Sequence, residues 1–326
     1  MNFFMSKVAK KISILPVILN LNKIKQVLLL LSFFVFFQLN AQYREDSIKL
    51  NDCFIHFYTK GEGRPVVLLQ GGPGFSSYYM RSIADSLSGY KCIFIDYEGT
   101  GKSQYRTPDK SWVSPEKIIS DIELVRKKLN IDVWDIIGHS YGTHFGLYYA
   151  VNYPQHVDKI ILVSSIGTSN QFQKYANDNA MVRLTPEDFS QLNTIDADSL
   201  LDPIEKQFKL ERILLKSYFF DKRKIDSFMN SVPSNEKQNY FNNNFFNAYF
   251  DNSNFWKWDI SEEAYKLKRP IRIIQGRQDF LTDGSQEILN LRLHDSKIYY
   301  IERSGHFPWL EKPSDLFPIL RKELVK

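Results

Sequence analysis

The sequence has little cysteine, with two residues in a chain of 326. Two cysteines cannot build the disulfide framework of a small secreted scaffold or a four-cysteine zinc site. Neither a zinc-binding H-E-x-x-H motif nor a collagen-like glycine repeat occurs in the chain. Apolar residues make up 43% and aromatic residues 15% of the sequence, a composition that excludes a largely disordered chain. We therefore expect a globular core with no metal and no other cofactor.

Acidic residues are absent from positions 1–41, which hold five lysines. Without these five, the rest of the chain has 37 basic and 37 acidic side chains, so the net charge of +5 belongs to the N-terminal segment. A neutral remainder lacks the basic surface that nucleic-acid binding requires. The charge therefore predicts no nucleic-acid partner.

The N-terminal segment also carries an apolar run from Val27 to Phe37, preceded by Lys23 and Lys25 and followed by Ala41. A bilayer requires about 20 apolar residues, and this run is shorter. Its length, the preceding charges and the small residue Ala41 are typical of a signal peptide. We expect residues 1–41 to be cleaved near Ala41, the mature protein to be periplasmic or secreted, and no stable membrane anchor to remain. The alternative is an uncleaved anchor that holds the protein at a membrane.

Short apolar runs follow one another through the rest of the chain, at residues 65–70, 92–96, 133–137, 160–163, 271–274 and 298–301. Such continuous runs are typical of strands buried on both faces, as in parallel sheets. Helical patterns separate them, for example after Ser114-Pro115 and again from Pro313 to the C-terminus. This alternation predicts an α/β fold with a mostly parallel sheet.

One long segment interrupts the alternation. Between Val163 and Ile271 no buried-strand pattern occurs, and helices are expected after Thr185-Pro186 and over residues 210–218 and 224–228. Thirteen of the 42 residues from 217 to 258 are aromatic. We interpret residues 168–262 as a helical cap inserted into a catalytic domain made of residues 42–167 and 263–326.

A G-x-S-x-G pattern, Gly138-His139-Ser140-Tyr141-Gly142, lies between a predicted buried strand and a helix. In this context the pattern indicates a nucleophile elbow, in which a sharp turn exposes the hydroxyl of Ser140. The glycines are required because the turn brings neighbouring backbone close to both positions. Ser140 is the predicted nucleophile.

A serine nucleophile needs a base, and the base needs a carboxylate to orient it. His306 follows the last predicted strand, in Gly305-His306, and is the candidate base. Among the loops that follow strands between Ser140 and His306, the one with Asp279 supplies a carboxylate. The chain order Ser, Asp, His is that of the α/β-hydrolase fold.

Gln70-Gly71-Gly72-Pro73-Gly74 follows the first buried strand, and glycine there lets backbone N–H groups approach an oxyanion. We expect the N–H groups of Gly72 and Tyr141 to form the oxyanion hole. A second glycine turn ends in Gly101-Lys102-Ser103, but a phosphate-binding loop would need glycine where Asp96 stands. We expect no nucleotide to bind there.

Together these motifs resemble those of the proline iminopeptidases, a branch of the α/β hydrolases. The resemblance covers about residues 50–165 and 265–326 and implies the same triad and oxyanion donors. It also implies an eight-stranded sheet with helices on both faces, whose second strand runs antiparallel beside the strand at Cys92. Cys53 and Cys92 would then lie at opposite ends of neighbouring strands, so the resemblance implies free thiols.

The resemblance has two departures, because Gln70 replaces the usual histidine and Glu98 the usual arginine. The resemblance implies a peptidase that releases N-terminal proline or another small apolar residue and holds the substrate amine with cap carboxylates. Glu187, Glu205 and Glu211 are candidates for that role, and no motif selects among them.

A carboxylesterase or C–C bond hydrolase with the same triad is the alternative. A non-catalytic binding protein is disfavoured by the intact motifs. In either enzyme the partner is a small peptide or ester substrate.

Overall fold

The predicted apolar runs form one eight-stranded sheet in the computed structural model, which describes residues 42–51, 53–103, 113–251 and 258–325. The expected signal peptide lies outside these residues. Within these ranges no helix is both long and apolar enough to cross a bilayer. The strands are β1 (Arg44–Lys49), β2 (Phe54–Lys60), β3 (Arg64–Leu69), β4 (Tyr90–Ile95), β5 (Trp134–His139), β6 (Val157–Val163), β7 (Ile271–Gly276) and β8 (Ser296–Ile301).

The strand order across the sheet is β1-β2-β4-β3-β5-β6-β7-β8. β1 pairs antiparallel with β2, and β2 pairs antiparallel with β4; every pair from β4 to β8 is parallel. The predicted α/β-hydrolase fold with its antiparallel second strand is confirmed. β5, which leads into the predicted elbow, lies between β3 and β6 in the interior of the sheet.

Helices cover both faces of the sheet because its strands are apolar on both sides. Val67 and Leu69 of β3 pack into one apolar cluster, whereas Val66 and Leu68 pack into another. The first cluster is completed by α2 (Pro115–Lys128), α3 (Tyr141–Asn152), α10 (Ser261–Ala264) and α11 (Asp283–Arg292). The second is completed by the 3-10 helix η1 (Ser77–Ser86), α12 (Pro308–Glu311) and α13 (Pro313–Leu324).

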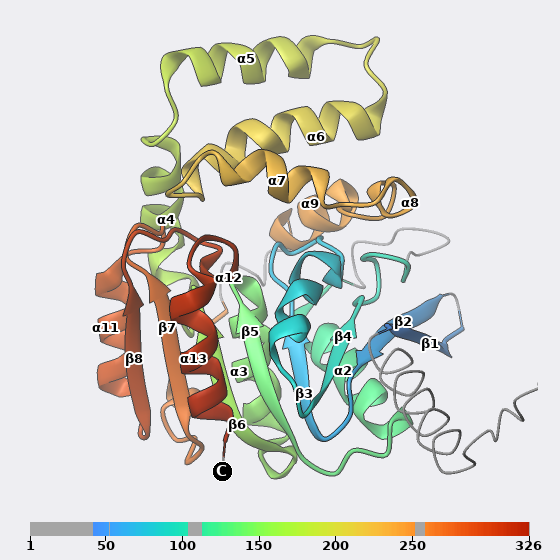
Figure 1. Ribbon diagram of the computed structural model, residues 1–326, viewed down its shortest axis with the longest axis vertical. Coiled ribbons are helices and arrows are strands. Elements are labelled where there is room, and N and C mark those ends of the chain that lie inside the picture. The colour runs from blue at the N-terminus through green and yellow to red at the C-terminus, as the bar shows by residue number, and fades with distance from the viewer. Residues whose placement is uncertain (1–41, 52, 104–112, 252–257, 326) are drawn as a thin grey trace, which may run out of the picture. The chain divides into compact units, whose positions relative to one another are not determined.

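A set of helices lies beyond the carboxyl ends of the parallel strands, at the top of Figure 1. They are α4 (Gln173–Met181), α5 (Pro186–Ala197), α6 (Pro203–Leu214), α7 (Lys224–Asn230), α8 (Ser234–Lys237) and α9 (Asn243–Asp251). We call this set the cap. Thr185 caps α5 as expected, in a reciprocal pair of hydrogen bonds with Asp188.

The helix expected over residues 210–218 begins earlier, at Pro203. The Asp202 carboxylate accepts hydrogen bonds from the backbone N–H groups of Ile204 and Glu205, which fixes the start of α6 there. The chain tightens into a 3-10 turn, η5 (Leu215–Ser217), before residue 218. The expectation was therefore wrong about both ends of this helix.

The two cysteines are free and buried, as expected. Lys60, at the end of β2, pairs with Cys92 of β4, whereas Cys53 precedes the start of β2. The two thiols therefore lie at opposite ends of the same strand pair, beyond the reach of a disulfide, which requires Cα atoms within about 7 Å.

Candidate active site

Ser140 occupies the sharp turn between β5 and α3. Its backbone has φ 54° and ψ −124°, a conformation that non-glycine residues rarely adopt. Its N–H donates a 3.0 Å hydrogen bond to the carbonyl of Val163, and its own carbonyl accepts from Thr143 at 3.0 Å. These bonds hold the strained turn that a nucleophile elbow requires.

The two glycines that flank Ser140 are required by close backbone contacts. A Cβ atom at Gly138 would lie 2.5 Å from the carbonyl oxygen of Gly142. A Cβ atom at Gly142 would overlap the carbonyl of Leu69, at the end of β3. Larger residues at either position would push α3 away from the sheet and open the turn.

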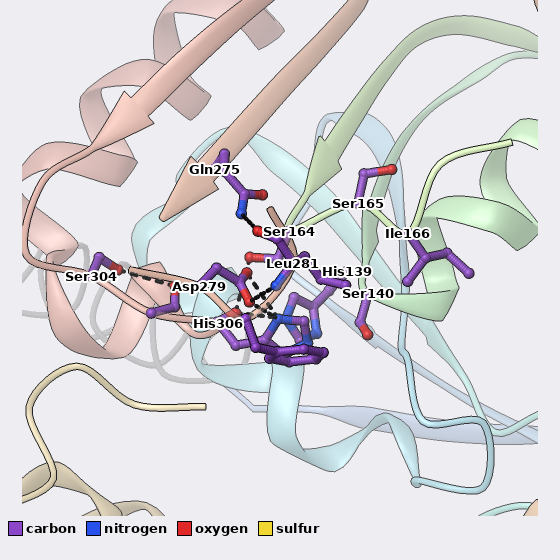
Figure 2. Close-up of polar contacts among 12 residues, drawn as sticks. His139, Ser140, Ser164, Ser165, Ile166, Gln275, Asp279, Leu281, Ser304 and His306 are labelled. Carbon is purple, nitrogen blue, oxygen red and sulfur yellow. Dashed lines mark hydrogen bonds and ion pairs between the residues drawn. The ribbon is translucent and has the colours of Figure 1, made fainter. Parts of the chain in front are cut away.

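His306 and Asp279 come together at the carboxyl ends of the neighbouring strands β7 and β8. The Nδ1 atom of His306 lies 3.0 Å from both carboxylate oxygens of Asp279 (Figure 2). The Asp279 carboxylate also accepts a hydrogen bond from the N–H of Leu281 at 3.1 Å. Both side chains are buried, with His306 2% and Asp279 4% exposed. The carboxylate thereby fixes the orientation of the imidazole ring.

The glycine turn after β3 packs directly against the elbow. A Cβ atom at Gly71 would lie 2.6 Å from the Cβ atom of Ser140. Gly72 has φ 125°, which favours glycine, and lines the same cavity as Ser140 and Tyr141. The two residues predicted to donate to an oxyanion therefore both border the space above the serine.

One cavity of about 130 Å³ is bordered by Gly72, Ser140, Tyr141 and His306. The structure thus brings together four of the five predicted site residues around one space, and Asp279 lies directly behind His306. Within the described part of the chain, the Ser140 hydroxyl makes no hydrogen bond to the His306 ring. Such bonds are often loose in a site without substrate and tighten when it binds.

The cavity is walled mainly by aromatic side chains and contains one carboxylate. Six of the aromatic residues in the wall are Phe75, Phe228, Tyr240, Phe246, Phe250 and Phe280. The carboxylate belongs to Glu211 of α6, and its Oε1 atom is buried without a hydrogen-bond partner among the residues described. Burial raises the pKa of Glu211 to about 8.

The other two candidate cap carboxylates do not border this cavity. Glu187 is exposed in the first turn of α5. Glu205 is exposed on α6, where it forms an ion pair of 2.8 Å with Lys209. Of the three candidates that the sequence left open, Glu211 is therefore the one that borders the cavity.

Three cap residues are hydrogen-bonded to the three loops that carry the candidate residues. Arg183, between α4 and α5, donates to the carbonyl of Asp279 at 2.7 Å. The carbonyl of Tyr218 accepts from the N–H of His306 at 2.8 Å. The N–H of Asn242 donates to the carbonyl of Gly74 at 3.0 Å. The cap segments thus form hydrogen bonds with backbone groups of each loop, in addition to any apolar packing.

Sequence reasoning did not identify two polar groups at the site. His139 was given no role beyond its place in the G-x-S-x-G pattern; it is buried, and its ring hydrogen-bonds to the carbonyl of His306. Arg183 carried no sequence signal, because its partners are backbone carbonyls distant in the chain. No group of three or more His, Cys, Asp or Glu side chains in the described ranges could hold a metal ion.

Comparison with known families and proteins agrees with this geometry. A family model described as alpha/beta hydrolase fold matches residues 64–313. The chain is similar to the proline iminopeptidase of Heyndrickxia coagulans, with 24% identity over 274 residues that cover 82% of this chain and 92% of that protein.

Solved structures with related folds include the proline iminopeptidase of Mycobacterium smegmatis, with a TM-score of 0.66 and 17% identity over 86% of this chain and 97% of that one. An esterase from Exiguobacterium antarcticum has a TM-score of 0.63 and 18% identity, over 86% of this chain and 98% of that one. At these identities the structural likeness establishes the fold alone.

Proposed function

The chain belongs to the alpha/beta hydrolase fold family and is a hydrolase, and on that premise we propose that it releases N-terminal proline or another small apolar residue from short peptides. The observation that carries the proposal is Glu211, the one carboxylate among the described residues of a mainly aromatic cavity, whose Oε1 atom has no described partner. An unpaired buried carboxylate is costly, and a substrate ammonium group in the cavity would supply the missing counter-charge.

The size of the cavity supports a small N-terminal residue. Its volume is about 130 Å³. An apolar protein cavity of about 150 Å³ is known to hold one benzene molecule. The space above Ser140 therefore suits one small ring or a short aliphatic side chain, and aromatic walls suit its apolar surface.

In the proposed reaction, the Ser140 hydroxyl attacks the carbonyl carbon of the first residue and passes its proton to Nε2 of His306. The Gly72 and Tyr141 N–H groups stabilise the resulting oxyanion. His306 then gives the proton to the leaving nitrogen, the C–N bond breaks, and an acyl-enzyme remains on Ser140. Water, activated by His306, releases the first residue as a free acid. Asp279 keeps the imidazole in the tautomer that accepts at Nε2.

The decisive experiment compares prolyl p-nitroanilide with its N-acetyl derivative. We expect the free-amine substrate to be cleaved and the acetylated one to be inert, because acetylation removes the charge that Glu211 would bind. Glu211→Gln should raise KM for the free-amine substrate about tenfold or more, since one charged hydrogen bond to a buried group is lost. Glu205→Gln, a change on the same helix but outside the cavity, is the matched control. Faster cleavage of the acetylated substrate would refute an aminopeptidase.

An esterase acting on an apolar acyl group is the second candidate. The raised pKa of Glu211, about 8, means that this carboxyl is largely uncharged at neutral pH before a cationic substrate binds. A neutral aromatic cavity also accepts an apolar acyl chain. Turnover of a short-chain p-nitrophenyl ester that exceeds that of the prolyl amide, and that is unaffected by Glu211→Gln, would favour this candidate.

A further inference from the structure

His139 directly precedes Ser140, and its ring joins two other parts of the site. Its Nε2 atom lies 2.8 Å from the carbonyl oxygen of His306, and its Nδ1 atom lies 2.8 Å from the hydroxyl of Tyr79. The Tyr79 hydroxyl also accepts a 2.7 Å hydrogen bond from the N–H of Gly71. Three hydrogen bonds thus run from Gly71 through Tyr79 and His139 to His306.

The partners of this chain of bonds fix the position of each proton. A carbonyl oxygen can only accept, so Nε2 of His139 carries a proton and donates it to His306. Burial and the neighbouring His306 hold the pKa of His139 well below its usual range, so the ring is neutral and Nδ1 is an acceptor. The Tyr79 hydroxyl then donates to Nδ1 and accepts from Gly71. This single placement of the protons therefore gives each donor in the chain of bonds an acceptor.

The two ends of the chain of bonds lie in loops, outside the helices and strands. Gly71 is followed by Gly72 in a glycine-rich turn, and His306 lies in the loop after β8. His139, by contrast, is the last residue of β5 in the interior of the sheet, and Tyr79 lies in η1. The bonds therefore tie both loops to a rigid strand at the residue beside the nucleophile.

We propose that Tyr79 and His139 are positioning residues that hold the oxyanion-binding turn and the catalytic histidine in register with Ser140. This inference rests on the proposed serine-hydrolase chemistry but not on the identity of the substrate. Neither side chain donates a proton to the substrate; each acts through the backbone of Gly71 or of His306. The pair is distinct from the triad, whose hydrogen bond to His306 is made at Nδ1 of the ring.

Simple packing does not account for the pair. The His139 ring contacts the rings of Tyr79, Phe307 and Trp309, with centroid distances of 5.6, 5.3 and 4.7 Å. An apolar side chain of similar size could fill that space. The polar atoms of His139 and Tyr79 instead form hydrogen bonds with the backbone groups at both ends, which an apolar side chain could not do.

The test uses the full chain and a fluorophosphonate probe, which labels a reactive serine whatever the natural substrate is. Tyr79→Phe keeps the ring and removes the hydroxyl. We expect its labelling rate and kcat to fall about tenfold to a hundredfold, while KM stays within about twofold. Tyr78→Phe is the matched control, because its hydroxyl bonds to Ser231 at the surface. We expect that control to be unchanged.

Substitutions of His139 separate the two bonds of the ring. His139→Gln can still donate from its amide to the His306 carbonyl, whereas His139→Leu cannot. The carbonyl also accepts from the Ser164 hydroxyl at 3.2 Å, so it keeps one donor in the leucine variant. We expect the labelling rate of the glutamine variant to be at least about tenfold higher than that of the leucine variant.

A spectroscopic measurement tests the inference without any variant. ¹⁵N NMR of the wild-type imidazoles should show His139 as the neutral Nε2–H tautomer at neutral pH. The Nδ1–H tautomer, or a folded Tyr79→Phe variant labelled at the wild-type rate, would overturn the inference. The wild type could also fail to cleave prolyl amides although the probe labels it normally and the variants show the effects described. That result would refute the aminopeptidase proposal alone and leave the positioning pair supported.

Discussion

The guanidinium of Arg183 donates a 2.7 Å hydrogen bond to the backbone carbonyl of Asp279. A second bond, of 2.6 Å, joins the same guanidinium to the carbonyl of Gln278. These two carbonyls belong to the turn that presents the Asp279 carboxylate to His306. A cap residue therefore holds the position of a group that orients the candidate base.

We predict that Arg183→Ala lowers turnover about tenfold and lowers the free energy of unfolding by about 1–3 kcal/mol, because the carbonyls it serves lose their donor. Steady-state kinetics and thermal unfolding measure the two effects. Arg292→Ala, at the surface of α11, is the control and should change neither. A variant with lower stability and wild-type turnover would mean that Arg183 supports the fold and not the site.

We predict that Ser140→Ala leaves the fold intact and lowers turnover at least about 10⁴-fold, because triad members act as a unit. Asp279→Asn should lose about as much, since an amide at this position favours the wrong tautomer of His306. Circular dichroism verifies folding, and Ser285→Ala, in the first turn of α11 and outside the cavity, is the control. Wild-type turnover by the Ser140→Ala variant would contradict serine catalysis altogether.

We predict that Glu211→Gln makes the protein more stable at high pH when no substrate is added. The ordinary pKa of this carboxyl is 4.5, and burial raises it to about 8 in the folded protein. Between these values the folded chain holds a proton that the unfolded chain has lost, so stability falls as the pH rises through this window. The full loss is reached above about pH 8.

The gain in the variant should be a few kcal/mol at pH 9 and close to zero at pH 4, because each pKa unit corresponds to about 1.4 kcal/mol and water in the cavity relieves part of the cost. Denaturant unfolding at both pH values measures the difference. Glu205→Gln, at an exposed position of the same helix and outside the cavity, is the matched control. An equal effect of Glu211→Gln at pH 4 and pH 9 would show that its carboxyl titrates normally.

We predict that Gly142→Ala destabilises the protein by more than about 3 kcal/mol, because the new Cβ overlaps the carbonyl of Leu69. Gly284→Ala is the matched control. A Cβ atom at Gly284 meets no atom within 4 Å, and the change replaces a glycine within the helix α11. That control should leave stability unchanged or raise it slightly. A stable Gly142→Ala variant would show that α3 can shift away from β3.

The fold was predictable because its signals are local. Buried strands such as β3 and β5 appear as continuous apolar runs, and Ser114-Pro115 marks the start of α2. The glycines around Ser140 identified the elbow for the same reason, since two short-range contacts demand them. The triad was proposed from chain order and loop position, and its catalytic role stays a prediction.

The remaining parts of the site depend on tertiary packing. Glu211 and Glu205 lie on the same helix, and which one faces the cavity is set by how α6 lies over the sheet. Arg183 and His139 donate hydrogen bonds to backbone carbonyls. Every residue has a backbone carbonyl, so the sequence does not indicate which ones accept these bonds. A motif search detects side chains that must be of one type, and it cannot detect the partners of a carbonyl oxygen.

The hydrogen bonds from Arg183, Tyr218 and Asn242 to the three site loops bear on how such enzymes can be engineered. A cap transplanted from a relative would have to place donors and acceptors opposite the same backbone groups of the loops at Asp279, His306 and Gly74. A chimera that changes substrate preference would therefore have to exchange these three loops together with the cap. The unit of exchange in this protein is thus the cap with its loops, although they are widely separated along the chain.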